Sequence, residues 1–124
     1  MAQRVRTWKA IQTTRMPQII KTQNYIDDVN YYVLLEQTSN NLPMIIRVLQ
    51  KIEIVLNSLE INPRQYQLHR GGTRSFNVEG KYTVVYEFDY TDKKTVHRVD
   101  DSDWHNGVVY LTKLFKGGFK DLSK

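Results

Sequence analysis

The chain has 124 residues, a length that fits one domain with a hydrophobic core of its own. Hydrophobic residues make up 40% of it and charged residues 25%, which is ordinary for a globular protein and too apolar for a disordered one. The absence of cysteine excludes disulfides, zinc–thiolate sites and cysteine nucleophiles. No apolar run approaches the roughly 20 residues of a membrane helix, and the first residues lead into no apolar stretch. Neither a membrane span nor a secretory signal is therefore expected.

The net charge of +5 is unevenly distributed along the chain. Residues 1–24 carry basic side chains and no acid, and residues 64–81 are mostly basic, whereas the acids gather in residues 87–103. This separation suggests an acidic partner, either a protein or a nucleic acid, although a solvated surface of uneven charge would give the same pattern.

Two amphipathic helices are predicted after a short strand at residues 4–8. The first helix should span residues 17–37, with Pro17 in its first turn, where the amide that proline lacks would be unpaired anyway. The second should span residues 42–59, because apolar residues recur there at steps of four and three. Asn62 and Pro63 should end it, since the residue before proline avoids the helical region. The short polar link between the helices predicts an antiparallel hairpin.

The apolar pattern then changes to a period of two. Residues 73–78 and 81–89 predict two strands around a tight turn at Glu79 and Gly80, and residues 94–99 predict a third. Within the second strand, Tyr82 begins an apolar series at every other residue, which is typical of a sheet with one packed face and one exposed or functional face. Residues 108–115 fit either a helix or a strand, and residues 116–124 are predicted to form a frayed tail.

These elements predict one α+β domain over residues 1–124. Its order is β-α-α-β-β-β, with a small antiparallel sheet of three to four strands packed against an N-terminal helical hairpin, because neither layer can bury its apolar side alone.

Four ordered stretches resemble the ParE/RelE superfamily of toxins from type II toxin–antitoxin pairs, and its ParE, or plasmid-stabilisation, branch most. They are residues 23–32 (Gln-Asn-Tyr-Ile-Asp-Asp-Val-Asn-Tyr-Tyr), residues 45–59 followed by Asn62 and Pro63, residues 72–78 (Gly-Thr-Arg-Ser-Phe-Asn-Val) and residues 80–88 (Gly-Lys-Tyr-Thr-Val-Val-Tyr-Glu-Phe). The last is similar to the family's glycine–tyrosine–valine–valine–tyrosine strand. The resemblance covers about residues 19–100 and implies a cytoplasmic toxin that a cognate antitoxin neutralises.

The resemblance leaves two activities open. RelE-like members cleave messenger RNA in the ribosome with a cluster of basic residues and a Tyr or His near the C-terminus, whereas ParE-like members bind and inhibit DNA gyrase. Thr83 stands where the cleaving members place an arginine, and a threonine cannot stabilise phosphate charge. Residues 100–103 contribute three carboxylates that would repel RNA. Both departures favour the gyrase inhibitor.

Candidate site residues differ between these activities. In a ribonuclease, His105 and Tyr110 would serve in acid–base roles, although a surface turn residue and a packed aromatic are the favoured explanations of the two. The candidate partner- or phosphate-binding residues are Arg64, Arg70, Arg74, Lys81 and Arg98, with solvated arginines in a loop as the alternative. Arg74 is favoured as functional or structurally paired, because it matches the family's strand arginine. The three histidines lack metal-ligand spacing, so no metal and no cofactor are expected.

The sequence thus favours a ParE-like toxin whose partners are DNA gyrase and a cognate antitoxin, with no hydrolytic residues of its own. Two alternatives remain open. One is a RelE-like, ribosome-dependent endoribonuclease, so whether the chain is an enzyme is undecided. The other is a non-toxic α+β interaction module of a phage or mobile element.

Overall fold

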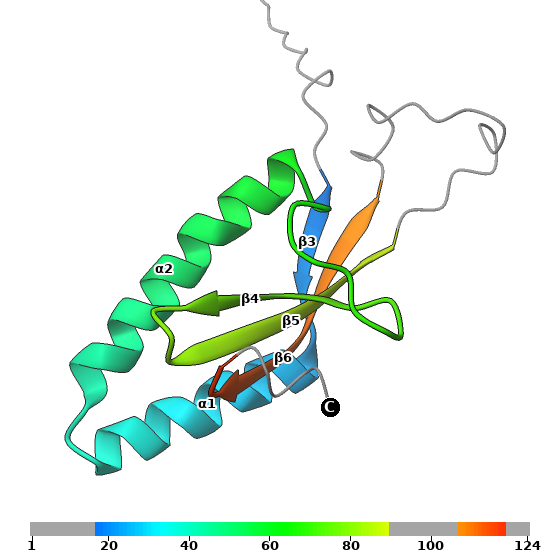
Figure 1. Ribbon diagram of the computed structural model, residues 1–124. Coiled ribbons are helices and arrows are strands. Elements are labelled where there is room, and N and C mark those ends of the chain that lie inside the picture. The colour runs from blue at the N-terminus through cyan, green and yellow to red at the C-terminus, as the bar shows by residue number, and fades with distance from the viewer. Residues whose placement is uncertain (1–16, 90–106, 119–124) are drawn as a thin grey trace, which may run out of the picture.

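The computed structural model describes residues 17–89 and 107–118 and contains two helices against a four-stranded sheet (Figure 1). The elements are β3 (Gln18–Lys21), α1 (Gln23–Thr38), α2 (Leu42–Ile61), β4 (Arg74–Val78), β5 (Tyr82–Asp89) and β6 (Val108–Lys116). The predicted α+β class and the order β-α-α-β-β-β are confirmed. None of the helices in these two segments is long and apolar enough to cross a membrane.

The sheet has the strand order β3-β6-β5-β4. Strands β4 and β5 pair antiparallel, as predicted, and β6 also pairs antiparallel with β5, but β3 pairs parallel to β6, so the sheet is mixed rather than antiparallel throughout. The segment after β5 that the sequence leaves open between helix and strand is the strand β6, and Lys116 belongs to it rather than to a tail. The strands predicted at residues 4–8 and 94–99 lie outside the described residues.

The first helix begins later than predicted, because a short strand precedes it. Gln18–Lys21 forms β3, and α1 begins only at Gln23. Thr22 sets the boundary because its side chain accepts a hydrogen bond from the Tyr25 amide as an N-cap, while its hydroxyl donates to the Leu111 carbonyl at 2.7 Å. Pro17 therefore precedes a strand, and Ile19 packs against the core from the sheet.

The polar link between the helices ends α1 and reverses the chain, as predicted. Asn40 adopts a left-handed φ of 59°, and the amides of Asn40 and Asn41 donate to the carbonyls of Gln37 and Glu36. This pair of bonds is a Schellman motif, which satisfies the last carbonyls of α1 and reverses the chain. The two helices then diverge with distance from this link (Figure 1).

The core lies between the helices and one face of the sheet. The apolar residues that recur at steps of four and three along α2 face the core, as predicted. Buried among them are Ile45, Ile52, Leu56 and Leu59, together with the β5 series that begins at Tyr82. Full burial of one such side chain contributes about 1.5–3 kcal/mol. On the opposite face of β5, which was predicted to be exposed or functional, Thr83 and Val85 are also buried, so this face is not exposed in the middle of the strand.

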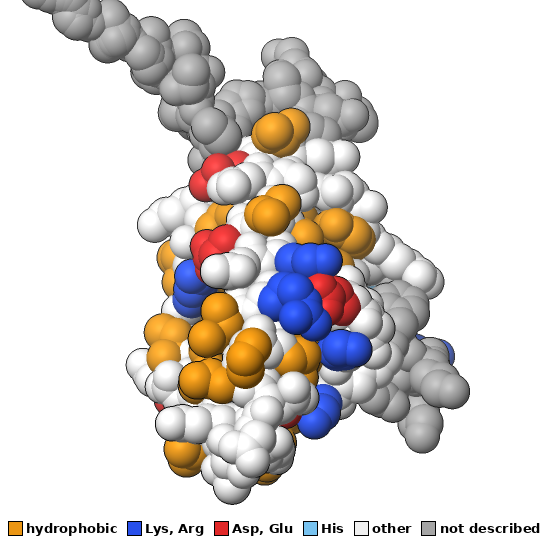
Figure 2. Space-filling model, turned by 90° about the vertical axis from the view of Figure 1, so that its left-hand side faces the viewer, with side chains coloured by type: hydrophobic (Ala, Val, Ile, Leu, Met, Phe, Trp, Pro, Cys, Tyr) orange, Lys and Arg blue, Asp and Glu red, His pale blue; other side chains and the backbone are white. Residues whose placement is uncertain are grey.

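The hairpin between β4 and β5 is fixed to α2 by charge. Glu79 and Gly80 both have positive φ, as the tight turn requires, and the Lys81 amide donates to the Val78 carbonyl at 2.9 Å. The Glu79 carboxylate accepts hydrogen bonds from Arg47 and Lys51 of α2, which lower its pKa to about 2. Cationic side chains surround one acidic side chain on this face of the molecule, beside a patch of apolar side chains (Figure 2).

Candidate functional site

Arg74, the favoured arginine of the predicted set, binds a loop of its own chain. It lies at the first position of β4 and is half-buried. Its Nη1 donates to the carbonyl oxygens of Tyr66 at 2.8 Å and of Arg64 at 3.3 Å. A planar guanidinium is suited to such double donation, and bonds from a charged donor are stronger than neutral ones. Arg74 therefore holds the segment that leads from α2 into the sheet.

Two aromatic side chains of β5 also contact the loop after α2 at this end of the sheet. The Arg64 guanidinium lies 5.6 Å from the centre of the Phe88 ring. The Tyr86 hydroxyl donates to the Pro63 carbonyl at 2.8 Å, and burial raises the pKa of Tyr86 to about 12, so this donor stays protonated at neutral pH. Arg64, on the loop after α2, and Arg74, at the start of β4, are thus brought together by hydrogen bonds to the backbone of this loop.

Arg70 lies exposed in the loop that precedes β4. The loop is closed by the His69 amide, which donates to the Thr73 carbonyl at 2.7 Å, and by an isolated bridge between Leu68 and Arg74. Gly71 and Gly72 have φ near +88° and +87°, a conformation that favours glycine, so the turn itself explains both glycines. Arg70 is thereby presented to solvent from a short, closed loop.

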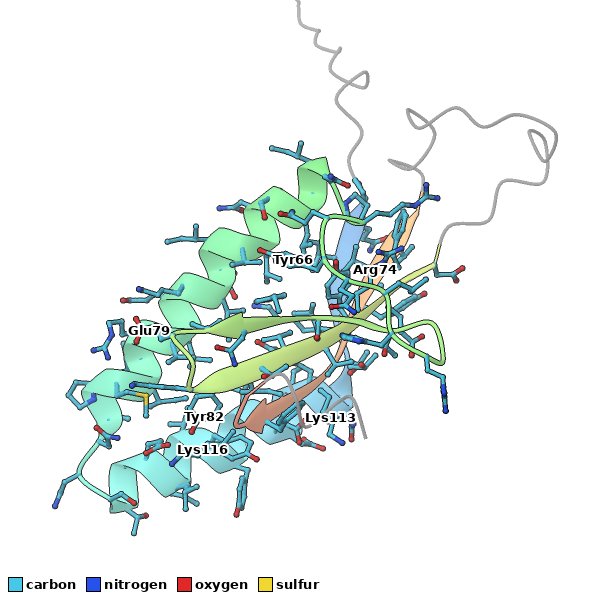
Figure 3. The ribbon with its side chains drawn as sticks, viewed as in Figure 1. Tyr66, Arg74, Glu79, Tyr82, Lys113 and Lys116 are labelled. Atoms are coloured by element: carbon cyan, nitrogen blue, oxygen red, sulfur yellow. The ribbon has the colours of Figure 1, made fainter. Side chains whose placement is uncertain are left out.

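The predicted basic set does not form one site. Lys81 follows the β4–β5 turn, at the opposite end of the hairpin from Arg74; Figure 3 shows Arg74 and Tyr66 at one end of β4 and Glu79 at the other. A five-residue strand separates these ends by about 13–17 Å. Arg98 and His105 lie outside the described residues. The structure therefore brings Arg64 and Arg74 into contact, places Arg70 in the loop just before Arg74, and leaves Lys81 apart.

The face of the sheet opposite the helices carries the remaining predicted residue, Tyr110. Tyr110 is half-buried on β6 and pairs with Glu87 of β5 on one side and Ile20 of β3 on the other. Thr83 on the same face is fully buried, and its hydroxyl donates to the Gly117 carbonyl at 2.9 Å. The Thr83 side chain thus fixes the end of β6 to β5.

The sequence missed a contact between His69 and Ser75 near this face. The His69 Nε2 and the Ser75 Oγ are 2.8 Å apart, and Ser75 is buried. The six-residue separation gives no recognisable motif, because the contact depends on the loop folding back along β4. In residues 17–89 and 107–118, no three potential ligands among His, Asp and Glu gather as a metal site would require.

A buried carboxylate, which the sequence also missed, joins α1 to the sheet. Glu36 is 1% exposed, and its carboxylate accepts from the Tyr82 hydroxyl at 2.5 Å, from Lys116 at 2.9 Å and from the Asn41 amide group at 3.4 Å. The hydrogen bonds from Tyr82 and then Lys116 lower the pKa of Glu36 despite its burial. Figure 3 shows Tyr82 and Lys116 close together beside α1. This cluster fixes the helical link to one end of the two inner strands, β5 and β6.

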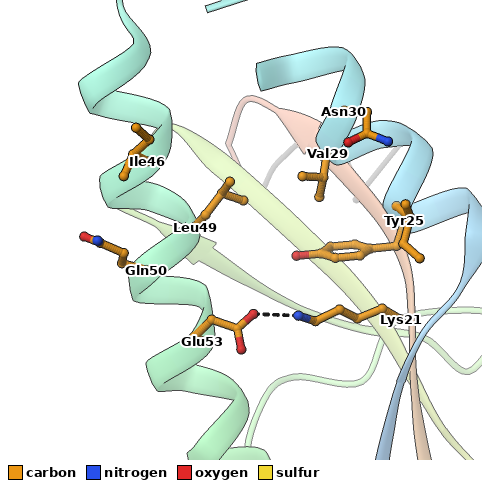
Figure 4. Close-up of a pocket in the computed structure, with 9 residues that line it drawn as sticks. Lys21, Tyr25, Val29, Asn30, Ile46, Leu49, Gln50 and Glu53 are labelled. Carbon is orange, nitrogen blue, oxygen red and sulfur yellow. Dashed lines mark hydrogen bonds and ion pairs between the residues drawn. The ribbon is translucent and has the colours of Figure 1, made fainter. Parts of the chain in front are cut away.

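A pocket of about 340 Å³ opens where the two helices diverge (Figure 4). Its walls are largely apolar and include Val29 of α1 with Ile46 and Leu49 of α2. At one side, Lys21 and Glu53 form an ion pair of 2.8 Å between the end of β3 and α2. The Tyr25 ring extends across the gap from α1 toward α2 and carries its oxygen into the pocket.

Comparison with models of known protein families finds no match to this chain, and comparison with curated protein sequences finds no similar protein.

Arg74→Ala should destabilise the protein by about 1.5–3 kcal/mol, because it removes a charged donor from two backbone carbonyls. Arg74→Lys should reduce the stability by less than Arg74→Ala does but should not reach the native value, since a point charge cannot reproduce the planar guanidinium. The measurement is the free energy of unfolding in urea. Arg70→Ala, the matched control, should change it by less than about 0.5 kcal/mol. Equal effects of Arg70→Ala and Arg74→Ala would contradict the role given to Arg74.

Tyr82→Phe should raise the pKa of Glu36 and destabilise the protein by about 1.5–3 kcal/mol at pH 7, because the carboxylate loses a buried donor. The folded-state pKa of Glu36 is below its unfolded value, so its stabilising effect is present above about pH 4.3 and is lost as the pH falls through the folded value. The difference between Tyr82→Phe and the native chain should therefore shrink in acid.

Carboxyl ¹³C NMR of Glu36 and urea unfolding at pH 7 and pH 3 test this pair of effects. Tyr31→Phe is the control, since Tyr31 is 60% exposed and lies outside the cluster. An unchanged pKa of Glu36 in Tyr82→Phe would show that the Tyr82 hydroxyl does not stabilise the carboxylate.

Proposed function

We propose that this chain is a ParE-like toxin of a type II toxin–antitoxin pair, which acts in the cytoplasm by binding and inhibiting DNA gyrase. The arrangement of the elements supports this proposal. The helical hairpin covers one face of the sheet, and β5, which carries the glycine–tyrosine–valine–valine–tyrosine pattern, lies inside the sheet between β4 and β6. A sheet packed against a helical hairpin is the fold that the resemblance implies.

The position of Thr83 favours a binding protein over a ribonuclease. A ribonuclease that works without a metal must stabilise phosphate charge on the sheet, and cationic side chains supply that stabilisation. Thr83 is buried and donates to the Gly117 carbonyl, and the other side chains on this face of β5 are Val85, Glu87 and Asp89. The described part of β5 therefore offers this face no positive charge.

Two surfaces are proposed for the two partners. The end of the sheet with Arg64, Arg70 and Arg74 would contact gyrase, because its cations are fixed by a hydrogen-bonded loop and suit an acidic surface. The antitoxin would cover apolar side chains that the helices leave exposed, including Leu34, Ile54 and Ile61, each more than 60% accessible. A disordered antitoxin segment that folds on binding can cover such dispersed positions.

An in vitro supercoiling assay with the purified chain and gyrase tests the proposal. Supercoiling should be inhibited, and Arg70→Ala should weaken inhibition about fivefold or more, because an exposed arginine at the centre of a contact is a frequent hot spot. Lys81→Ala, at the far end of the hairpin, should leave inhibition unchanged. Full gyrase activity at excess protein, with translation arrested instead, would contradict the proposal and favour the ribonuclease.

Expression in a bacterium supplies the second arm of the same test. The chain should arrest growth, and co-expression of the neighbouring reading frame should restore it. Normal growth at a high level of folded protein would favour the non-toxic interaction module.

A further inference from the structure

The pocket between α1 and α2 contains a buried polar group that the described part of the chain does not satisfy. Tyr25 is 3% exposed, and among residues 17–89 and 107–118 its hydroxyl oxygen takes part in no hydrogen bond. Buried polar side-chain atoms almost always have a partner, because an unpaired one loses its hydration without compensation. Burial, and secondarily the charge of Glu53, raise the pKa of this phenol, so it remains a hydrogen-bond donor at physiological pH.

We infer that this pocket binds a small, neutral, amphipathic molecule whose apolar body fills the space between the helices and whose carbonyl or hydroxyl oxygen accepts a hydrogen bond from Tyr25. The volume of about 340 Å³ lies at the small end of the range of about 300–1,000 Å³ for ligand pockets. Such pockets are mostly apolar with a few convergent polar groups, which describes Val29, Ile46 and Leu49 around the Tyr25 hydroxyl (Figure 4).

The size of the pocket favours a molecule larger than water. A water occupies about 30 Å³, so one water on the phenol would fill about a tenth of the space and leave the apolar walls without contacts. An apolar side chain inserted from a partner protein would contact the apolar walls but would leave the phenol without a hydrogen-bond partner. An occupant with an apolar body and one oxygen acceptor satisfies both requirements.

The ion pair beside the phenol selects a neutral occupant. Lys21 and Glu53 already neutralise one another at 2.8 Å, and both remain about half exposed. The pair presents no net charge to the pocket, so a carboxylate or an ammonium group would lose hydration there without an unpaired counter-charge to compensate it. This inference does not depend on the proposed toxin activity.

Four probes of nearly equal shape test the inference: acetophenone, ethylbenzene, benzoate and 1-phenylethylammonium. Each is titrated into the full chain with detection by ¹H–¹⁵N NMR. Acetophenone should shift amides of residues 25–30 and 46–53 with a Kd of about 1 mM or below, an affinity within reach of so small a molecule. Ethylbenzene should bind about two- to tenfold more weakly, because it lacks the acceptor. The two charged probes should bind more weakly than acetophenone.

Variants identify the groups responsible. Tyr25→Phe should abolish the preference for acetophenone over ethylbenzene by weakening acetophenone about two- to tenfold, because it removes only the donor. Ile46→Ser should weaken both neutral probes. Its matched control is Ile54→Ser, since Ile54 is another exposed isoleucine of α2 but does not line the pocket, and it should change neither affinity.

Several outcomes would overturn the inference. They are equal affinities for acetophenone and ethylbenzene in the native chain, tighter binding of either charged probe, equal effects of Ile46→Ser and Ile54→Ser, and the absence of shifts at the pocket. The probe preference and the isoleucine pair remain decisive if Tyr25→Phe does not fold.

Discussion

Two tyrosines on one face of β5 hold the last turn of α1, just before α2, and the loop just after α2, and the rest of the structure depends on this constraint. Tyr82 and Tyr86 are four residues apart on the face that meets the helices, and both are fully buried. The Tyr82 hydroxyl donates to Glu36 beside the start of α2, and the Tyr86 hydroxyl donates to the Pro63 carbonyl just beyond its end. Their rings supply burial in the middle of the core, while their oxygens determine how the long helix lies across the sheet.

The same constraint explains where the molecule is open. The link between the helices is held by Glu36 and the Schellman motif, so α1 and α2 are close there and diverge farther along. The pocket lies in this divergence, closed at one side by the pair of Lys21 and Glu53. At the opposite end of α2, the Pro63 contact places the following loop where Arg74 binds its carbonyls. A partner surface at this loop and a pocket between the helices are therefore separate features of one arrangement.

The sequence predicted those elements whose local pattern agrees with their tertiary environment. The apolar steps of α2 and the period of two in β5 are strong because each faces one continuous core. The strand Gln18–Lys21 was missed, because four residues next to a helical stripe carry too little pattern and their partners in β6 are 90 residues away in sequence. The burial of Glu36 could have been predicted, because Glu36 continues the helical spacing of Tyr25, Val29 and Tyr32 along α1. A carboxylate at such a position indicates a buried partner, but the sequence does not name Tyr82 or Lys116 as that partner.

The candidate site was harder to predict because it depends on the path of the loop. Sequence proximity grouped Arg74 with Lys81, whereas the hairpin places them at opposite ends. The pocket was not predictable at all, since its walls come from three elements and its polar group, Tyr25, is an ordinary core residue by pattern. The central claim is that β5, paired on both sides and held through its tyrosines, is the most stable element. Native-state amide hydrogen exchange tests it most directly. Amides of Tyr82 to Phe88 should exchange only through global unfolding, and those of the edge strand β3 through smaller openings. Exchange in β5 as fast as in β3 would contradict the account.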